Sequence, residues 1–190
     1  MTDFIYTLYN DKRTVFTLPE IALLLNESNF LRLKQRINYY VRNKKIESIR
    51  KGIYVKPLFN KEELACKIYA PSYLSLEYVL QKEGIIFQFS NTLTVVSYLS
   101  RAIEVDNTTI QLSKLKSAIL LNSSGIVRDD TGVNIATKER AILDILYLKQ
   151  DYYFDFIDTI NEKILLELLP LYESKALEKR VKKLNNGGHK

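Results

Sequence analysis

The fold of the first part of the chain is decided by residues 17–55, which read TLPEIALLLNESNFLRLKQRINYYVRNKKIESIRKGIYV. Thr17 and Glu20 have the spacing of a capping box, with a proline between them, and an apolar run follows. This pattern predicts a short helix. The polar cluster at 26–29 predicts a tight turn, after which apolar residues recur with helical period over 30–43.

The helix predicted over 30–43 has two chemically different sides. The apolar side is a stripe formed by Phe30, Leu33, Ile37 and Val41. The opposite side holds cationic and hydrogen-bonding residues, namely Arg32, Gln35, Arg36, Tyr39, Arg42 and Asn43. No carboxylate occurs between Asn29 and Lys45. A solvated helix face normally mixes both signs of charge, so this pattern favours a face that reads DNA.

After this helix the period changes to that of strands. Residues 46–50 and 53–55 are short β-prone runs joined by a Lys-Gly pair, which predicts a hairpin with a basic tip at Arg50 and Lys51. A weaker helical pattern precedes the capping box, at 3–10. Three helices followed by a basic hairpin predict a winged helix-turn-helix, with the third helix in the major groove and the hairpin along the backbone or minor groove.

The charge is unevenly distributed along the chain. Residues 1–58 hold 11 Lys and Arg against 5 Asp and Glu, a balance of +6, whereas residues 59–190 hold 17 against 17. The whole excess therefore lies in the segment with the predicted recognition helix. This asymmetry indicates an anionic partner, nucleic acid or a membrane surface, for the N-terminal part.

We place the domain boundary near residue 58, after which the pattern becomes mixed α/β. The fold class predicted for the whole chain is α+β: a winged helix-turn-helix over 1–58, then an α/β domain over 59–190 that ends in helices. The elements expected in the second domain are helices over 60–68, 71–84, 137–148, 154–169 and 171–184, and strands over 85–87, 92–97, 102–105, 109–112 and 118–121.

Residue counts exclude several kinds of chemistry. Cys66 is the only cysteine and His189 the only histidine, which removes disulfide frameworks, Cys/His zinc sites and Ser-His-Asp mechanisms. Phosphate-binding and metalloprotease motifs are missing too. No run of 18 apolar residues and no signal-peptide pattern occurs. We therefore expect a cytoplasmic protein that is not an enzyme, with no cofactor, no metal and no membrane partner.

Five individual residues in the second domain have simple structural interpretations. We expect Asp129 and Asp130 to lie in a solvated turn before Gly132, not in a metal site. Glu139 and Asp144 are predicted to make surface pairs on their helix. Cys66 is expected to be a small buried hydrophobe.

Four blocks resemble the AbiEi antitoxins of type IV, or abortive-infection, toxin–antitoxin systems. In chain order they are IRKGIYV at 49–55, PSYLSLE at 71–77 with GII at 84–86, LTVVS at 93–97, and IATKERAILD at 135–144. The resemblance covers about residues 10–150. The chain departs from the family in having Lys-Glu-Arg at 138–140, where Pro-Glu-Lys is usual, and in following the pattern only loosely over 98–122.

The resemblance implies a bacterial protein whose winged helix binds double-stranded operator DNA and represses its own operon. It also implies that the C-terminal domain counters a nucleotidyltransferase-like toxin encoded beside it. Two other classes of function stay open. One is a stand-alone winged-helix regulator whose second domain senses a ligand or dimerises, and the other is an enzyme with a DNA-binding arm.

Overall fold

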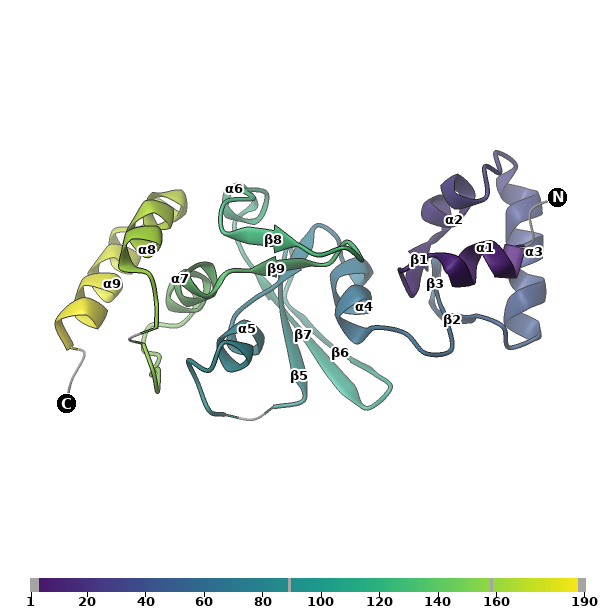
Figure 1. Cartoon of the computed structure of the whole chain (residues 1–190). Helices are drawn as coiled ribbons and strands as arrows, with labels where there is room; N and C mark the ends of the chain where they lie inside the picture. The colour runs from purple at the N-terminus through teal and green to yellow at the C-terminus, as the bar shows by residue number, and fades with distance from the viewer. Residues whose placement is uncertain (1–3, 89, 158, 188–190) are drawn as a thin grey trace. The chain divides into compact units, whose positions relative to one another are not determined.

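The computed structural model describes residues 4–88, 90–157 and 159–187 and combines helices with strands (Figure 1). The mixed α+β class expected from the sequence is therefore confirmed. Two compact units divide the chain, Met1–Ile68 with Asp130–Gly132, and Tyr69–Asp129 with Val133–Lys190. Among the described residues, no helix is long and apolar enough to cross a membrane.

The first unit has four helices and a small antiparallel sheet. In chain order its elements are α1 (Phe4–Asn10), β1 (Val15–Thr17), α2 (Leu18–Leu24), α3 (Phe30–Arg42), β2 (Glu47–Arg50), β3 (Ile53–Val55) and α4 (Lys61–Ile68). The strand order is β1-β3-β2, with Val15 opposite Val55. The sequence did not predict β1, because three residues are too few for a period-2 pattern.

Local signals in the first unit act as expected. The hydroxyl of Thr17 accepts from the Glu20 amide, and the Glu20 carboxylate accepts from the Thr17 amide, so the capping box is formed. Gly52 closes the hairpin with a φ of +82°, in the left-handed region that glycine enters freely. Ile21 and Ala22 of α2 pack with Leu33 and other side chains of this unit in one hydrophobic core.

The first unit extends ten residues beyond the boundary placed near residue 58. The reason lies in Glu63 of α4, whose side chain is buried. Its carboxylate accepts hydrogen bonds from the backbone amides of Thr14 and Val15, at 2.9 and 3.0 Å. A buried carboxylate needs such donors, so α4 and β1 stabilise each other within one unit.

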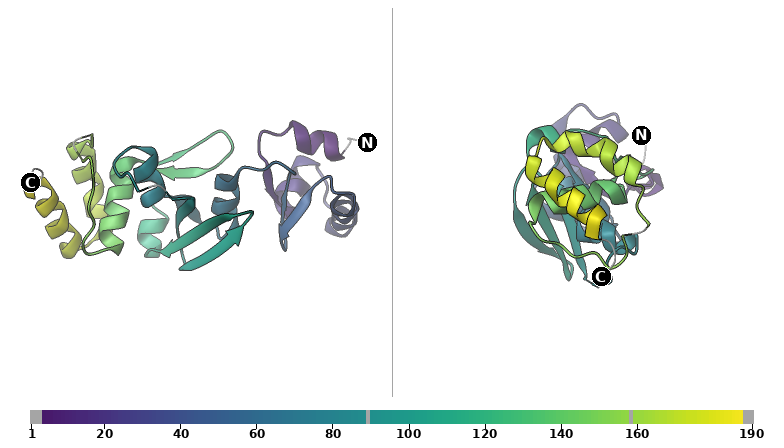
Figure 2. Two further views of the ribbon diagram at one scale, coloured as in Figure 1. Left: turned by 90° about the horizontal axis from the view of Figure 1, so that it is seen from below. Right: turned by 90° about the vertical axis from the view of Figure 1, so that its left-hand side faces the viewer.

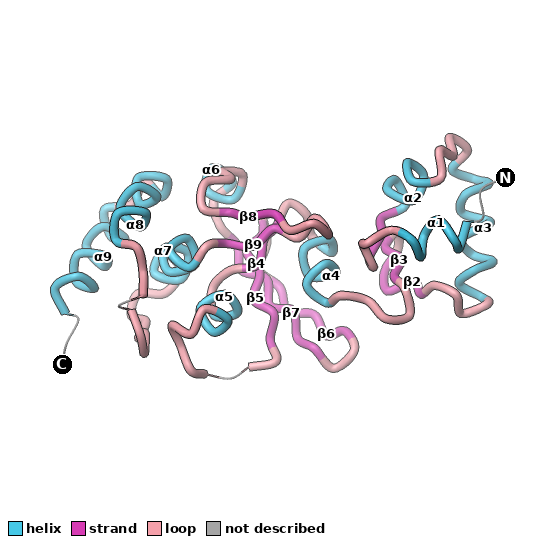
Figure 3. The backbone as a smooth tube through the Cα atoms, in the orientation of Figure 1, coloured by secondary structure: helices cyan, strands magenta, loops and turns pink. Residues whose placement is uncertain are grey.

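The second unit is built on a six-stranded mixed sheet (Figure 3). Its strands are β4 (Ser72–Leu74), β5 (Thr92–Ser97), β6 (Arg101–Val105), β7 (Thr108–Lys114), β8 (Ile126–Arg128) and β9 (Asn134–Ala136), in the order β6-β7-β5-β4-β9-β8. Its helices are α5 (Glu77–Lys82), α6 (Ser117–Leu120), α7 (Lys138–Leu148), α8 (Glu162–Leu168), the 3₁₀ turn η1 (Leu169–Tyr172) and α9 (Lys175–Gly187).

Three predicted elements of the second unit are wrong. The helix expected over 71–84 is divided into β4 and the shorter α5, because β4 pairs with both β5 and β9 in the middle of the sheet. Residues 85–87 form a loop, in which the Ile85 carbonyl accepts from the amides of Asp155 and Phe156. The apolar run at 118–121 lies mainly in α6, since so short a run fits helix and strand equally well.

The C-terminal helices differ in length from those expected. The helix predicted over 154–169 is limited to α8, which Asn161 caps by accepting from the amides of Lys163 and Ile164. The helix predicted over 171–184 begins only at Lys175, after η1, and continues to Gly187. Figure 2 shows α8 and α9 beside α7, on which both pack.

Polar side chains lie buried between α7, β4 and η1. Asp144 has no exposed surface and accepts hydrogen bonds from the hydroxyls of Tyr73, Ser75 and Tyr172, at 3.0, 2.7 and 2.6 Å. Arg140, also fully buried, lies 3.5 Å from the same carboxylate. The predicted surface pairs of Glu139 and Asp144 are therefore wrong.

The physical reason for this error is that α7 is covered on most sides, so polar groups on it must find partners inside the protein. Glu139 is buried too and accepts from the Asn161 amide at 3.0 Å. Burial raises the pKa of Asp144, while the Arg140 charge and the hydroxyl donors favour the carboxylate. Burial and then the Asp144 charge raise the pKa of Tyr73 and Tyr172, so both phenols stay protonated.

Two smaller predictions are confirmed. Cys66 is buried within α4. Asp129 begins a turn in which its side chain accepts from the Val133 amide, while its own amide donates to the Val133 carbonyl. The carboxylate of Asp129 thus has a structural partner in the turn.

Candidate nucleic-acid interface

A short, hydrogen-bonded turn sets the direction of α3. Asn26 follows α2 with a φ of 50°, a left-handed conformation that asparagine tolerates. The Glu27 amide then donates to the Ala22 carbonyl at 2.9 Å. Asn29 caps α3 by accepting from the Arg32 amide at 3.0 Å. The polar cluster read as a turn is therefore the joint between the two helices.

The buried side of α3 is centred on Leu33 and Ile37, neither of which has exposed surface. At about 100° per residue the opposite side is centred on Gln35 and Arg42. Four of the predicted contact residues are exposed on or beside this side, namely Arg32, Gln35, Tyr39 and Arg42. The structure therefore brings these four together on one helix face, as the periodicity predicted.

Arg36 does not lie on the outer face. It is half-buried, and its guanidinium carbon stands 5.3 Å from the ring centre of Phe4 in α1. The Phe4 ring also stacks on Tyr40, which turns the buried side of α3 toward Tyr40 and away from Phe30, whose side chain is 47% exposed. The predicted apolar stripe is therefore confirmed at Leu33, Ile37 and Val41 and wrong at Phe30.

Asn43 ends α3 and its side chain is engaged there. Its Nδ2 donates to the Tyr39 carbonyl at 2.8 Å, which satisfies one of the carbonyls left unpaired at a helix C-terminus. Arg36 and Asn43 thus both have contacts within the protein, and their contact with DNA stays a prediction.

The two basic residues of the hairpin, Arg50 and Lys51, are both exposed. The hairpin is anchored to the start of α2, where the Leu18 amide donates to the Gly52 carbonyl at 3.1 Å. A register shift in β2 between Ser48 and Arg50 bends this strand before the turn. The basic tip thus belongs to the small sheet, whose Phe16 shares a hydrophobic core with Leu33 and Ile37 of α3.

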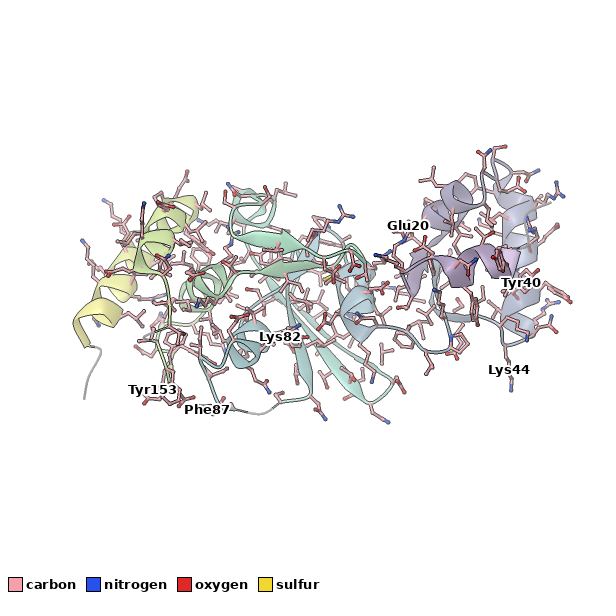
Figure 4. The ribbon with its side chains drawn as sticks, in the orientation of Figure 1. Glu20, Tyr40, Lys44, Lys82, Phe87 and Tyr153 are labelled. Atoms are coloured by element: carbon pink, nitrogen blue, oxygen red, sulfur yellow. The ribbon has the colours of Figure 1, made fainter. Side chains whose placement is uncertain are left out.

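Sequence reasoning missed several exposed residues on and after α3: Leu31, Lys34, Asn38, Lys44 and Lys45. The missing carboxylates over this whole stretch were the signal that could have found the polar ones. Lys34 lies at the edge of the predicted apolar stripe, and Lys44 and Lys45 follow the helix, so the predicted outer face does not include them. Lys44 projects from the end of α3 (Figure 4).

The cations of α3 are not neutralised within the described part of the chain. Arg32, Lys34, Arg36 and Arg42 form no ion pair with any residue that the structure describes. Two carboxylates of this unit are paired with other cations. Asp11 pairs with Arg13 at 2.7 Å, and Glu20 pairs with Lys67 at 2.6 Å.

Those pairings also hold the carboxylates ionised. The hydrogen bond from Arg13 lowers the pKa of Asp11. Partial burial opposes ionisation of Glu20, but hydrogen bonds from Lys67 and Thr17 outweigh it and lower the pKa of Glu20. Because α3 holds no carboxylate and its cations form no ion pair among the described residues, its outer face is positively charged, and such a face attracts an anion.

The chemistry available on this surface is hydrogen bonding and charge, without a reacting group. Guanidinium and carboxamide side chains suit the edges of guanine and adenine, and lysines suit phosphates. Across the ranges that the structure describes, no three His, Cys, Asp or Glu side chains gather where they could hold a metal ion.

No model of a known protein family matches the chain, and comparison with curated proteins likewise gave no match.

Proposed function

We propose that the first unit is a winged helix-turn-helix domain that binds double-stranded DNA. The element order helix-strand-helix-helix-strand-strand supports this, with α2 and α3 as the helix pair and the β2–β3 hairpin as the wing. The observation that carries the proposal is the outer face of α3, which combines cations and carboxamides with no carboxylate. Such a face complements the floor and walls of the major groove.

The dimensions of α3 suit this role. Its 13 residues span about 20 Å, and an α-helix fits a B-DNA major groove about 12 Å wide. In this arrangement Arg32 and Gln35, in the first half of α3, approach base edges. Arg42, Arg50 and Lys51 contact phosphates, which fix the register of the protein on the duplex.

We further propose that the chain is an antitoxin and autorepressor of a type IV abortive-infection operon, acting in the bacterial cytoplasm. The resemblance of residues 10–150 to AbiEi antitoxins supports this. In this proposal the first unit represses the operon through operator DNA. The second unit counters the nucleotidyltransferase-like toxin encoded beside it and performs no catalytic step.

DNA binding is tested by titrating the full-length chain against a duplex of its own promoter between 50 and 200 mM salt. If about five phosphates are neutralised, log K falls against log[salt] with a slope of about −4 to −5. A variant with Arg32→Ala and Arg42→Ala provides the matched comparison, with a shallower slope. A salt-independent affinity in the wild type would contradict the proposal.

The antitoxin role is tested by co-expression with the product of the adjacent gene. The wild type should restore growth and silence a promoter reporter. A variant with Gln35→Ala and Arg42→Ala should lose silencing and keep rescue, because both changes lie on α3. Failure of the wild type to rescue would overturn the antitoxin role and leave DNA binding intact.

A second candidate function, a stand-alone regulator that senses a ligand, is favoured by one groove in the second unit. The groove has a volume of about 520 Å³, and its lining includes Gln81, Thr92, Thr94, Gln111 and Ser113. If this candidate is correct, repression of the promoter in cells changes with growth conditions even when no toxin gene is present. Ser113→Phe, which fills the groove, should abolish that response.

A further inference from the structure

The outer face of α3 carries one large aliphatic side chain among its polar and aromatic ones. Leu31 is 71% exposed. At about 100° per residue it lies about 40° from Gln35 and one turn earlier, so the two share a face. Isolated exposed leucines are ordinary on protein surfaces. Leu31 differs from these because it stands at the N-terminal end of α3, the part of a recognition helix that reaches base edges.

Leu31 has no packing role that accounts for its position. Leu33 and Ile37 fill the core beneath α3. Leu31 lies about half a turn around the helix axis from them, on the side away from the core. A leucine also adds nothing to solubility or to phosphate binding. In the DNA-bound protein its only favourable contact with bases is apolar.

One base presents an apolar group in the major groove. Thymine carries a 5-methyl group there, whereas the other edges of the base pairs are mainly hydrogen-bond donors and acceptors. The partner of thymine, adenine, is the base that a glutamine recognises through N6 and N7. Leu31 and Gln35 are therefore chemically matched to neighbouring A·T pairs.

The spacing of the two residues fits the spacing of base pairs. Four residues advance about 6 Å along a helix, and successive bases on a strand are about 3.4 Å apart. When Gln35 contacts one base pair, Leu31 therefore lies level with a base pair that is one or two steps away along the duplex. We infer that Leu31 is a specificity-determining residue that contacts a thymine methyl within two base pairs of the adenine read by Gln35.

This inference rests on the proposed DNA binding and names the sequence feature that the binding site contains. The test begins by selecting the tightest duplex from a random library with the full-length chain. Each thymine of that duplex is then replaced by deoxyuridine, which removes only the methyl group. For the wild type, one replacement should weaken binding about fourfold, the size expected for one buried methyl-sized group.

The matched variants are Leu31→Ala and Leu23→Ala. Both side chains are largely exposed, at 71% and 82%, so neither change should unfold the protein. Leu31→Ala should bind the thymine and deoxyuridine duplexes equally well. Leu23→Ala, on α2, should keep the fourfold difference.

The failure of DNA binding and the failure of the thymine contact give different results. If no duplex is enriched and none binds, the proposed DNA binding itself is wrong. If a duplex binds but no deoxyuridine replacement weakens it, the contact with thymine is wrong while DNA binding stands. The contact is equally overturned if Leu31→Ala keeps the full difference.

Discussion

The Arg36 guanidinium carbon lies 5.3 Å from the ring centre of Phe4, and the same ring stacks on Tyr40 at 4.6 Å with the planes 13° apart. Two side chains one turn apart on α3 thus hold a single aromatic ring of α1. The charge of Arg36 interacts with the ring quadrupole, which makes the residue part of the packing between α1 and α3.

Removing this contact should lower stability more than removing an exposed arginine from the same helix. We expect Arg36→Ala to reduce the free energy of unfolding by about 0.5–1 kcal/mol. Arg42→Ala, the control, should change it by less than about 0.5 kcal/mol. Denaturant unfolding of the full-length chain measures both, and a larger loss for Arg42→Ala would refute the assigned role.

Gln35 and Lys51 should affect DNA binding in different ways. Gln35→Ala should cost about 1–3 kcal/mol on the selected duplex and little on random DNA, because it removes a contact to a base edge. Lys51→Ala should weaken both duplexes about equally and make the salt slope shallower by about 1. Equal losses on both duplexes for Gln35→Ala would show that α3 does not read sequence.

Asp144 should be among the most sensitive positions of the second unit. In the Asp144→Ala variant the buried guanidinium of Arg140 loses its ion-pair partner, and the hydroxyls of Tyr73 and Ser75 lose their hydrogen-bond acceptor. Loss of one partner of a buried ion pair typically costs about 3–5 kcal/mol. Asp151→Ala, at an exposed aspartate, is the control and should be nearly neutral in thermal unfolding. Similar melting curves for the two variants would count against a structural role for the cluster.

The pair between Glu20 and Lys67 predicts a pH dependence. The pKa of Glu20 is lowered from its ordinary value of 4.5 in the folded protein, so its stabilising contribution is present above that value and is lost as the pH falls through the lowered one. Glu20→Gln should therefore cost about 1 kcal/mol or less at pH 7 and nothing once wild-type Glu20 is protonated. A constant difference from pH 7 to pH 2 would disprove the linkage.

Much of the candidate site followed from the sequence alone. The capping residues Thr17 and Glu20, the helical period of α3 and the glycine of the hairpin act through contacts a few residues apart, so each leaves a local pattern. The helical period likewise predicted Arg32, Gln35, Tyr39 and Arg42 on one exposed face. These features depend on local geometry and composition, which are written directly in the residue order.

The tertiary structure decided the features that depend on distant partners. The Phe4 ring contacts Arg36, so the buried side of α3 turns toward Phe4 and Arg36 leaves the outer face. Glu63 accepts a hydrogen bond from the start of β1, and the first unit therefore extends to Ile68. In the second unit, pairing with two strands made β4 a strand within a stretch that reads as a helix. Burial of α7 turned Asp144 from an expected surface charge into the centre of a hydrogen-bonded cluster. In each case a contact between residues far apart in the chain outweighs a local preference of at most about 1 kcal/mol per residue.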